Sequence, residues 1–462
     1  MAEPSGHNIP CPRCVVLERR IEALEARVRE LEALLLEATR AAKRQAAPFS
    51  RNKPKLQPKK PGRPEGHAPA HRPAPPPESI TQTIDTPLAD HCPACGTALE
   101  DHQCHEQTLT DLPKIEPVVT KYVCHSGYCP RCRRRVRSKH PDQPSTAGGA
   151  ASHQIGPNAL ALGADLKHRL GLSYQKTAEL FQSHFGLTTC AAALVRAERR
   201  IALLADKTYQ SLITIARYSP VVCGDETGWR IGGRFAWLWV FTNRIVTVYL
   251  IRESRGRGVI EDVLGPEFGG VLSSDCCASY DPIAAADKQK CLGHIIKDLS
   301  TLESIKTRGA VRFPREALSV LRDAIDLKRR ADGMSEHGYA VARGKIESRM
   351  DSLLGRDYTD PDNRRLANRM IKHREHLFTF LYVDEVEPTN NAAERAIRPA
   401  VIARKLSGGN RSPTGAETHS ILASLAATAR QHGATLVHAV TDLLRHRDPN
   451  YVTPRLFNPQ PA

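Results

Sequence analysis

The segment VVCGDETGWRIGGRFAWLWVFTNRIVTVYLI, residues 221–251, decides the fold because its pattern requires consecutive β-strands. Runs rich in β-branched and aromatic residues are separated by Gly232-Gly233 and by Asn243-Arg244, which are pairs typical of tight hairpin turns. We therefore expect strands at 221–231, 235–242 and 245–251, joined as an antiparallel meander. Within the first strand, Asp225 places a carboxylate among apolar residues, which makes it a candidate for chemistry.

A helix and a further strand are expected next. Residues 254–264 have a helical pattern, and residues 270–275 are expected to form a fourth short strand that ends at Asp275. The order strand, strand, strand, helix, strand, with one acid on the first strand and another at the end of the fourth, is that of a ribonuclease-H-like α/β fold. Residues 288–292 are a candidate fifth strand, followed by a helix that begins near His294.

A third acid, Glu394, stands in the sequence PTNNAAERAIRP. Thr389 or Asn390 can cap a helix there, which would direct Glu394 from its first turns toward the sheet. Carboxylate oxygens are the ligands that Mg²⁺ prefers, and a cluster of them can hold the metals of a phosphodiester-cleaving site. We expect a folded domain to bring Glu394 together with Asp225 and Asp275.

Alternative residues are available for this chemistry. Glu226 is a rival to Asp225, because a shift of one residue turns a strand side chain to the opposite face, and Asp281 is a second rival. His294 could orient a phosphate or a water, or it could be a packed histidine at a helix start. The tryptophans of the strands are expected in the core rather than as base-stacking platforms: Trp229, Trp237 and Trp239.

Charge indicates a polyanionic partner. The 462 residues include 66 Lys and Arg against 50 Asp and Glu, a formal net charge of +16, and double-stranded DNA is the expected partner. Gly-Arg-Pro at residues 62–64 is similar to the core of an AT-hook, although general phosphate attraction explains it equally well. The residues expected to contact DNA are Arg63, Arg131, Arg133, Arg134, Arg395, Arg398, Arg404, Lys405 and Arg411.

Two cysteine pairs predict a structural zinc site. Cys92-Pro-Ala-Cys95 and Cys129-Pro-Arg-Cys132 have the spacing of two zinc knuckles, in which four thiolates hold Zn²⁺ tetrahedrally. Cys124 is an alternative to Cys129 as a ligand. The N-terminus lacks the pattern of a secretory signal, and no apolar run is long enough to span a membrane, so we expect the cytoplasm, where thiols stay reduced. The role of the lone pair Cys11 and Cys14 stays open.

Two helical segments suggest assembly and DNA recognition. A 3.5-residue apolar repeat begins near the N-terminus, which predicts a short coiled coil and self-association, or else a helix packed on its own domain. Residues 173–185, Gly186 and a second helix capped by Thr188 or Thr189 have the spacing of a helix-turn-helix, with plain packing as the alternative. The apolar positions of the repeat are Leu17, Ile21, Leu24, Val28, Leu31 and Leu35.

These patterns divide the chain into segments with different expected roles. The predicted order is an N-terminal helix, a basic Pro-rich linker, a zinc-binding module, a helical domain, the first part of the catalytic core, a helical insertion, and the core helix with a helical C-terminal region. The corresponding ranges are 1–45, 46–87, 88–144, 145–218, 219–299, 300–380 and 381–462.

Across nearly its whole length the chain resembles the insertion-sequence 66 family of bacterial transposases. The resemblance rests on the zipper, basic linker and zinc module, on DETGWR with WLWVFT, on SRGRGVIEDVLG with GVLSSD, on KCLGHIIKDL and LFTFLY, and on PTNNAAERAIRPAVIARKLSGGNRSPTGAE. Two positions depart from relatives. Cys276-Cys277 stand where a glycine usually follows the second aspartate, and Leu-Gly-His stands where Trp-Ala-His is usual.

The resemblance implies a DDE transposase. Its acidic triad falls on Asp225, Asp275 and Glu394, which would hold two Mg²⁺ or Mn²⁺ ions for cleavage and transfer of DNA strands. It also implies a homo-oligomer, DNA ends and target DNA as partners, and accessory proteins encoded by the same element. The alternatives are a catalytically inactive or domesticated relative that binds DNA through its zinc module, and a nuclease that only hydrolyses.

Overall fold

The structure is a computed structural model that describes residues 17, 19–28, 30–32, 73–101, 103–113, 115–140, 142–143 and 153–457. The chain divides into two compact units, Met1–Lys114 and Ile115–Ala462, which are described separately. Cys11, Cys14, Leu35 and Arg63 lie outside the described residues. No helix within the described ranges combines the length and apolar character needed to cross a membrane. The seven predicted segment limits stay a prediction.

In the first unit, residues 19–28 and 30–32 are helical, as the apolar repeat predicts. A short 3-10 turn spans Pro77–Ser79. An isolated antiparallel bridge between His91 and Ala98 then closes the turn that contains Cys92 and Cys95.

The second unit is built on a mixed sheet with the strand order β5-β4-β3-β6-β7. The first three strands form the predicted antiparallel meander, while β6 runs parallel to β3, and β7 runs parallel to β6. A separate hairpin, β1 with β2, precedes them. The strand bounds are β1 (Ser126–Cys129), β2 (Arg134–Arg137), β3 (Val221–Ile231), β4 (Arg234–Thr242), β5 (Thr247–Arg252), β6 (Glu267–Ser274) and β7 (Ala284–Lys290).

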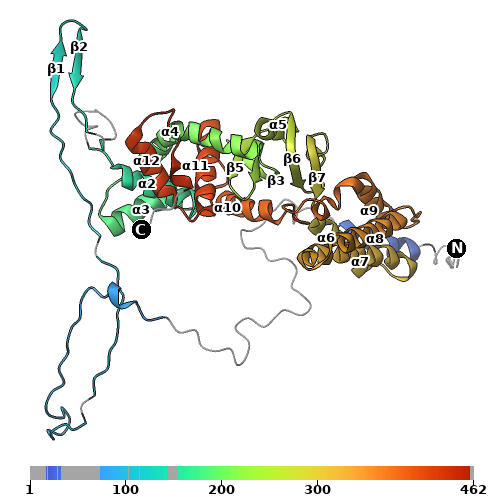
Figure 1. Ribbon diagram of the computed structural model, residues 1–462, viewed down its shortest axis with the longest axis horizontal. Coiled ribbons are helices and arrows are strands. Elements are labelled where there is room, and N and C mark those ends of the chain that lie inside the picture. Colours follow the sequence, from blue (N-terminus) through green and yellow to red (C-terminus); the bar gives the residue numbers. More distant parts are fainter. Residues whose placement is uncertain are drawn as a thin grey trace, which may run out of the picture. The chain divides into compact units, whose positions relative to one another are not determined.

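Helices surround this sheet and extend beyond it (Figure 1). The helix bounds are α2 (Pro157–His168), α3 (Tyr174–Phe185), α4 (Ala191–Arg217), α5 (Gly258–Leu264), α6 (Leu292–Ile305), α7 (Arg312–Arg329), α8 (Glu336–Leu354), α9 (Pro361–Lys372), α10 (Asn391–Ser407), α11 (Pro413–Gln431) and α12 (Leu436–His446).

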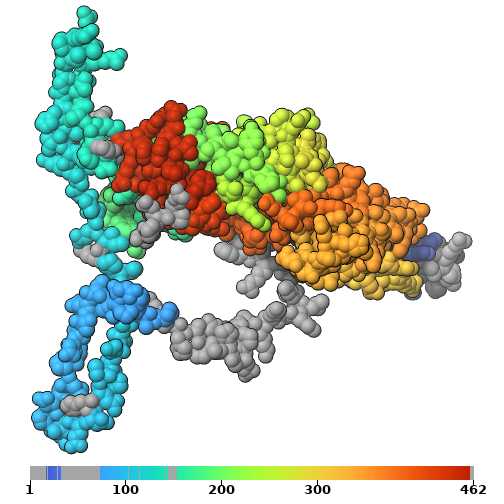
Figure 2. Space-filling view, viewed as in Figure 1, coloured from blue at the N-terminus to red at the C-terminus, as the bar shows by residue number. Residues whose placement is uncertain are grey.

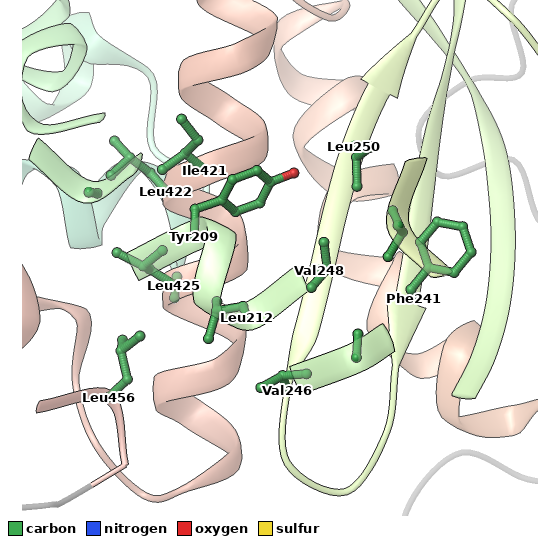
Figure 3. Packing of buried hydrophobic residues seen from close by; sticks show 14 of the residues in the cluster. Tyr209, Leu212, Phe241, Val246, Val248, Leu250, Ile421, Leu422, Leu425 and Leu456 are labelled. Carbon is green, nitrogen blue, oxygen red and sulfur yellow. The ribbon is translucent and has the colours of Figure 1, made fainter. Parts of the chain in front are cut away.

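The two faces of the sheet bury different helices. One face packs against α4 and α5, and Figure 3 shows Tyr209 and Leu212 of α4 in the same core as Val248 and Leu250 of β5. Helix α11 lies along the edge strand β5 and contributes side chains to the clusters on both faces. The other face packs against α10, where Trp229 of β3 lies in one cluster with α10 side chains. Trp229 and Trp239 are buried, as predicted, whereas Trp237 is half-buried.

A separate helical core holds α6, α7, α8 and α9 together beside the sheet. Phe313 and Leu321 of α7, Met350 of α8 and Met370 of α9 are all buried in it. In the space-filling view, the orange side chains of these helices form a continuous mass next to the yellow and green part that contains the sheet (Figure 2). The helical character predicted for residues 300–380 is confirmed.

Several turns match their prediction in detail. Gly232 and Gly233 both have positive φ, of 56° and 83°, which suits the tight turn between β3 and β4. Ser173 caps α3 by accepting a hydrogen bond from the backbone N–H of Lys176, and Gly186 ends the helix in the left-handed conformation.

Other local predictions were wrong. Thr188 and Thr189 do not cap α4, because the helix begins one residue after Cys190, which makes no side-chain cap. The turn after β4 is longer than two residues, since Asn243 Oδ1 accepts from the backbone N–H groups of Ile245 and Val246 and so folds a wider loop. The fifth strand lies earlier than expected, at β7, because Leu292 already starts α6.

Candidate active site

Asp225 and Asp275 lie at the same level on neighbouring parallel strands. The register of β3 with β6 pairs Cys223 with Ser273, and each aspartate lies two residues farther along the chain than its member of that pair. Asp275 follows directly after the last residue of β6. Because the carboxyl ends of parallel strands open onto one edge of a sheet, this edge is a natural place for a site.

The start of α6 is fixed next to Asp275 by backbone hydrogen bonds. The N–H of Cys291 donates to the carbonyl of Ser274, the residue before Asp275, at 2.8 Å. The N–H of Leu292 donates to the carbonyl of Pro388 at 2.9 Å, which ties the same helix start to the segment leading into α10. These bonds bring α6 and α10 together at the end of β6.

Asn390 fixes the start of α10 next to Asp225. Its side-chain Nδ2 donates to the carbonyl of Gly224 at 2.7 Å, and its backbone N–H donates to Cys291 Sγ at 3.1 Å. Asn390 therefore occupies the N-cap position without capping the helix through its side chain, contrary to the prediction, because that side chain binds β3 instead. As a result, the first turn of α10, which contains Glu394, is anchored at the residue before Asp225.

The acids interact electrostatically. The pKa of Asp225 is raised to about 7, mainly by burial and also by the charges of Glu226, Asp275 and Glu394, against a hydrogen bond from the Glu226 N–H that lowers it. Carboxylates that repel one another in a partly buried site gain most from a divalent cation between them. A donor set of hard carboxylate oxygens fits Mg²⁺ or Mn²⁺.

Glu226, the rival of Asp225, is committed to other partners. Its side chain is only 2% exposed, and it forms an ion pair with Arg255 at 2.7 Å and accepts from the Tyr280 hydroxyl at 2.9 Å. A ligand oxygen of Glu226 also lies within 4.8 Å of one on Asp275. Because each of its oxygens already accepts a strong hydrogen bond, the geometry favours Asp225 as the open carboxylate of β3.

Asp281, the second rival, forms ion pairs. Lys290 Nζ lies 3.1 Å and Lys372 Nζ 2.6 Å from its carboxylate. Although burial works the other way, these lysines hold the pKa of Asp281 below its ordinary value. Lys290 is itself buried and also donates to the carbonyl of Asp275, so this network supports the end of β6.

A cysteine that sequence reasoning missed stands beside the third acid. The thiol of Cys291 is buried and hydrogen-bonded to His294, and His294 Nδ1 lies 3.8 Å from a carboxylate oxygen of Glu394. The hydrogen bond with Cys291, together with the charges of Cys291, Glu394 and Asp275, raises the pKa of His294 to about 9. The Cys-x-x-His spacing ahead of a predicted helix was the available signal.

The unusual Cys276-Cys277 pair supports the second aspartate. The backbone N–H of Cys277 donates to Asp275 Oδ1 at 2.8 Å, which fixes the carboxylate at the end of β6. The side chain of Cys276 is half-buried and packs against the helical core of α6 to α9. The departure from glycine is therefore compatible with an ordered Asp275.

The predicted basic residues of α10 divide into two kinds. Arg395 and Arg398 are exposed on the helix that bears Glu394, and so are Lys405 and Arg411 near its end. Arg404, by contrast, donates through Nη1 to Thr227 Oγ1 at 3.0 Å and to the carbonyl of Gly228, so it holds α10 on β3.

A groove lies beside these residues on the face of the sheet covered by α10. A cavity of about 750 Å³ is lined by Val221 and Cys223 of β3, by a row of alanines from α10 and α11, and by Arg395 and Arg430. Cys223 and Asp225 point to the same face of β3, since strand side chains alternate. Asp225 therefore lies on the face of β3 that borders this groove, although none of the three acids is among the residues that line it.

The two predicted cysteine pairs lie in different units. In the first unit, the N–H of Gly96, which has positive φ, donates to the carbonyl of Cys92 at 2.8 Å, and hydrogen bonds with Thr97 lower the pKa of Cys95. The chain therefore turns tightly around Cys92 and Cys95, as a zinc knuckle requires.

In the second unit, Cys129 ends β1 and Cys132 lies in the turn before β2. The N–H of Cys132 lies 3.5 Å from Cys129 Sγ, and this contact lowers the pKa of the Cys129 thiol. Cys124 accepts a hydrogen bond from Gln143 at 3.1 Å. Arg131, Arg133 and Arg134 are exposed on the same hairpin.

A mixed sheet with Asp225 on β3, Asp275 directly after β6 and Glu394 on α10, on a strongly basic chain, is compatible with a transposase domain. Residues 152–418, more than half of the chain, match the family described as Transposase IS66 family, and the chain belongs to this family. It is also similar to an uncharacterized protein, y4hP, of Sinorhizobium fredii (strain NBRC 101917 / NGR234). That similarity is 25% identity over 208 residues, which cover 39% of this chain and 37% of the relative.

Proposed function

We propose that the chain is a DDE transposase with a ribonuclease-H-like core, which cleaves the ends of an insertion sequence and joins them to target DNA in the bacterial cytoplasm. The single observation that carries this proposal is the hydrogen bond from Asn390 Nδ2 to the carbonyl of Gly224, which holds the start of α10, and with it Glu394, beside the strand that bears Asp225. The pKa of Asp225, raised mainly by burial and also by the charges of Asp275 and Glu394, supports the proposal. The strand order, with three antiparallel strands followed by two parallel ones, supports the same core.

In this proposal Asp225, Asp275 and Glu394 hold two Mg²⁺ or Mn²⁺ ions. Bound metal would supply activation of the attacking hydroxyl and stabilisation of the leaving oxygen. The chain's own residues position that chemistry. Asn390 and the N–H of Cys277 orient the acids, as the hydrogen bonds above describe, and Arg395 and Arg398 attract the DNA backbone to the same face.

The cysteine knuckles are proposed to bind a structural Zn²⁺ through Cys92, Cys95, Cys129 and Cys132. The local turns support this, since hydrogen bonds lower the pKa of one thiol in each pair and so favour the thiolate that a metal requires. Metal analysis of the purified chain tests it. We expect Cys129→Ser to lose one equivalent of the Zn²⁺ that the wild-type chain binds. Retention of this zinc in Cys129→Ser but not in Cys124→Ser would assign the ligand to Cys124 instead.

The activity is tested with labelled DNA that carries the element's own ends, with Mg²⁺ or Mn²⁺ and with the accessory proteins present. We expect cleavage and joining that require metal and are abolished in Asp275→Ala. Asp262→Ala, at an exposed helical acid outside the cluster, is the matched control and should retain activity. Tight, salt-sensitive binding without chemistry would favour the inactive DNA-binding alternative, and cleavage without joining would favour a nuclease.

A further inference from the structure

We propose that Cys291, His294 and Glu394 form a binding site for Zn²⁺ or a similar thiophilic divalent cation, distinct from the Mg²⁺ site and from the cysteine knuckles. One ligand atom from each of these residues lies within 4.8 Å of the other two. A thiol, an imidazole and a carboxylate are the ligand types that Zn²⁺ binds, and the hard cation Mg²⁺ does not favour the first two.

The backbone prepares this site. Cys291 and His294 stand three residues apart across the first turn of α6, so their side chains share one face of the helix. Glu394 occupies the equivalent first turn of α10, and the bond from the Asn390 N–H to Cys291 Sγ fixes the two helix starts together. In a tetrahedral zinc site the ligand atoms stand about 3.5 Å apart, so small side-chain rotations suffice here.

The exposure of two of the three ligands leaves the fourth coordination position of the cation open. The thiol side is buried, whereas His294 and Glu394 have side chains 48% and 44% exposed, so a cation can enter from the solvent side. With three protein ligands, the site would keep one position for water or for a DNA oxygen.

Occupancy would have a regulatory consequence, which rests on the proposed function. Glu394 has a single carboxylate. If a cation held by Cys291 and His294 binds this carboxylate, the carboxylate is no longer available to a metal at Asp225 and Asp275. We therefore infer that Zn²⁺ inhibits strand cleavage in Mg²⁺ by competing for Glu394, and that Cys291 and His294 confer this sensitivity.

Binding is tested by titrating the full chain with Co²⁺, whose thiolate charge-transfer absorption reports cysteine ligation. Because other cysteines also bind cobalt, the measured quantity is the difference between wild type and Cys291→Ser, with exposed Cys190→Ser as the matched control. We expect Cys291→Ser to lose one equivalent of the thiolate signal and Cys190→Ser to lose none. Equal signals in wild type and a folded Cys291→Ser would overturn the site.

His294→Ala provides a second test, because this half-exposed side chain can be removed without opening the core. We expect it to keep the fold by circular dichroism and to weaken cobalt binding at the Cys291 signal by more than about tenfold. Unchanged affinity would exclude His294 as a ligand and overturn the proposal.

The inhibitory consequence is measured as the ratio of cleavage with and without Zn²⁺ at constant Mg²⁺, taken for each variant against itself. We expect inhibition of Cys291→Ser to require at least tenfold more Zn²⁺ than inhibition of wild type. Equal inhibition of both proteins would overturn competition at this site. If wild type does not cleave DNA at all, the proposed function fails, while the cobalt spectra still decide whether the site exists.

Discussion

At the scale of single residues, Asp225 is the acid of the candidate site whose ionisation the fold disfavours most. Its pKa lies at about 7 instead of its ordinary 3.8, so between these values the folded chain binds a proton that the unfolded chain releases. A raised pKa of this kind contributes stability below about pH 4, and that contribution is lost as the pH rises through 7. In metal-free protein, ionised Asp225 is therefore destabilising at pH 8.

We predict that Asp225→Asn stabilises the metal-free protein at pH 8, on the order of 1–3 kcal/mol, and that the gain shrinks toward pH 4. Thermal unfolding at both pH values with a chelator measures it. Asp281→Asn is the matched control and should be destabilising at pH 8, because lysines lower the pKa of Asp281. Added Mg²⁺ should raise the melting temperature of wild type but not of Asp225→Asn. An Asp225→Asn variant equally unstable at both pH values would contradict this electrostatic account.

At the scale of elements, the edge strand β5 is protected by hydroxyl groups of α11. The N–H groups of Tyr249 and Ile251 donate to Ser424 Oγ at 2.8 Å and to Ser420 Oγ at 3.1 Å. Thr428 binds the backbone of Thr247 in the same way. Hydroxyls four residues apart on a helix match N–H groups two residues apart on a strand, because both intervals span about 6 Å. The helix thus covers an edge that would otherwise be open to pairing.

We predict that Ser424→Ala lowers the free energy of unfolding by about 1–3 kcal/mol, because it leaves the buried N–H of Tyr249 without an acceptor. Denaturant unfolding measures the change. Ser424→Cys restores a weak acceptor and should recover part of the loss. Ser183→Ala, at an exposed serine of α3, should change stability by less than about 0.5 kcal/mol. If Ser424→Ala leaves the free energy of unfolding unchanged, water or a shifted helix must supply the acceptor for the N–H of Tyr249.

The arginines of α10 predict a separation of stability from DNA binding. Arg404→Ala removes the bonds that hold α10 on Thr227 and Gly228, so we expect loss of stability together with loss of activity. Arg398→Ala, on the exposed side of the same helix, should leave the melting temperature unchanged and weaken DNA binding, with the salt dependence reduced by about one phosphate contact. Binding measured over a series of salt concentrations decides. The reverse assignment of the two effects would contradict the structure.

Much of the core was predictable at this scale, because its signals are local. Gly232-Gly233 and the Ser173 cap are encoded by the residues that form them. The role of Asn390 was not predictable, because an asparagine at a helix start is expected to cap the helix. Its actual role depends on Gly224, which only the folded chain places beside it. Likewise the family pattern predicts which acids form the site, but only the folded chain reveals that Glu226 forms an ion pair with Arg255.

At the scale of the whole molecule, we expect assembly to depend on the N-terminal helix. Its repeated apolar residues lie on one stripe and are between 51% and 61% exposed in the single chain: Leu17, Ile21, Leu24, Val28 and Leu31. Exposing such a stripe on a helix rich in Glu and Arg costs free energy that pairing with a second copy would recover. Two DNA ends must be processed together for an element to move, so a transposase needs such an assembly.

We predict that the chain self-associates through this stripe and that Leu24→Glu abolishes the association, because a carboxylate would be buried in the seam. Sedimentation of the full chain measures it, and wild type should exceed the mass of one chain at micromolar concentration. Ala23→Glu adds the same charge at a position outside the repeat and should stay associated. If both variants sediment as wild type, another surface assembles the protein. If wild type is already monomeric, the stripe needs a different partner, and joining of paired DNA ends should then be equally efficient in Leu24→Glu.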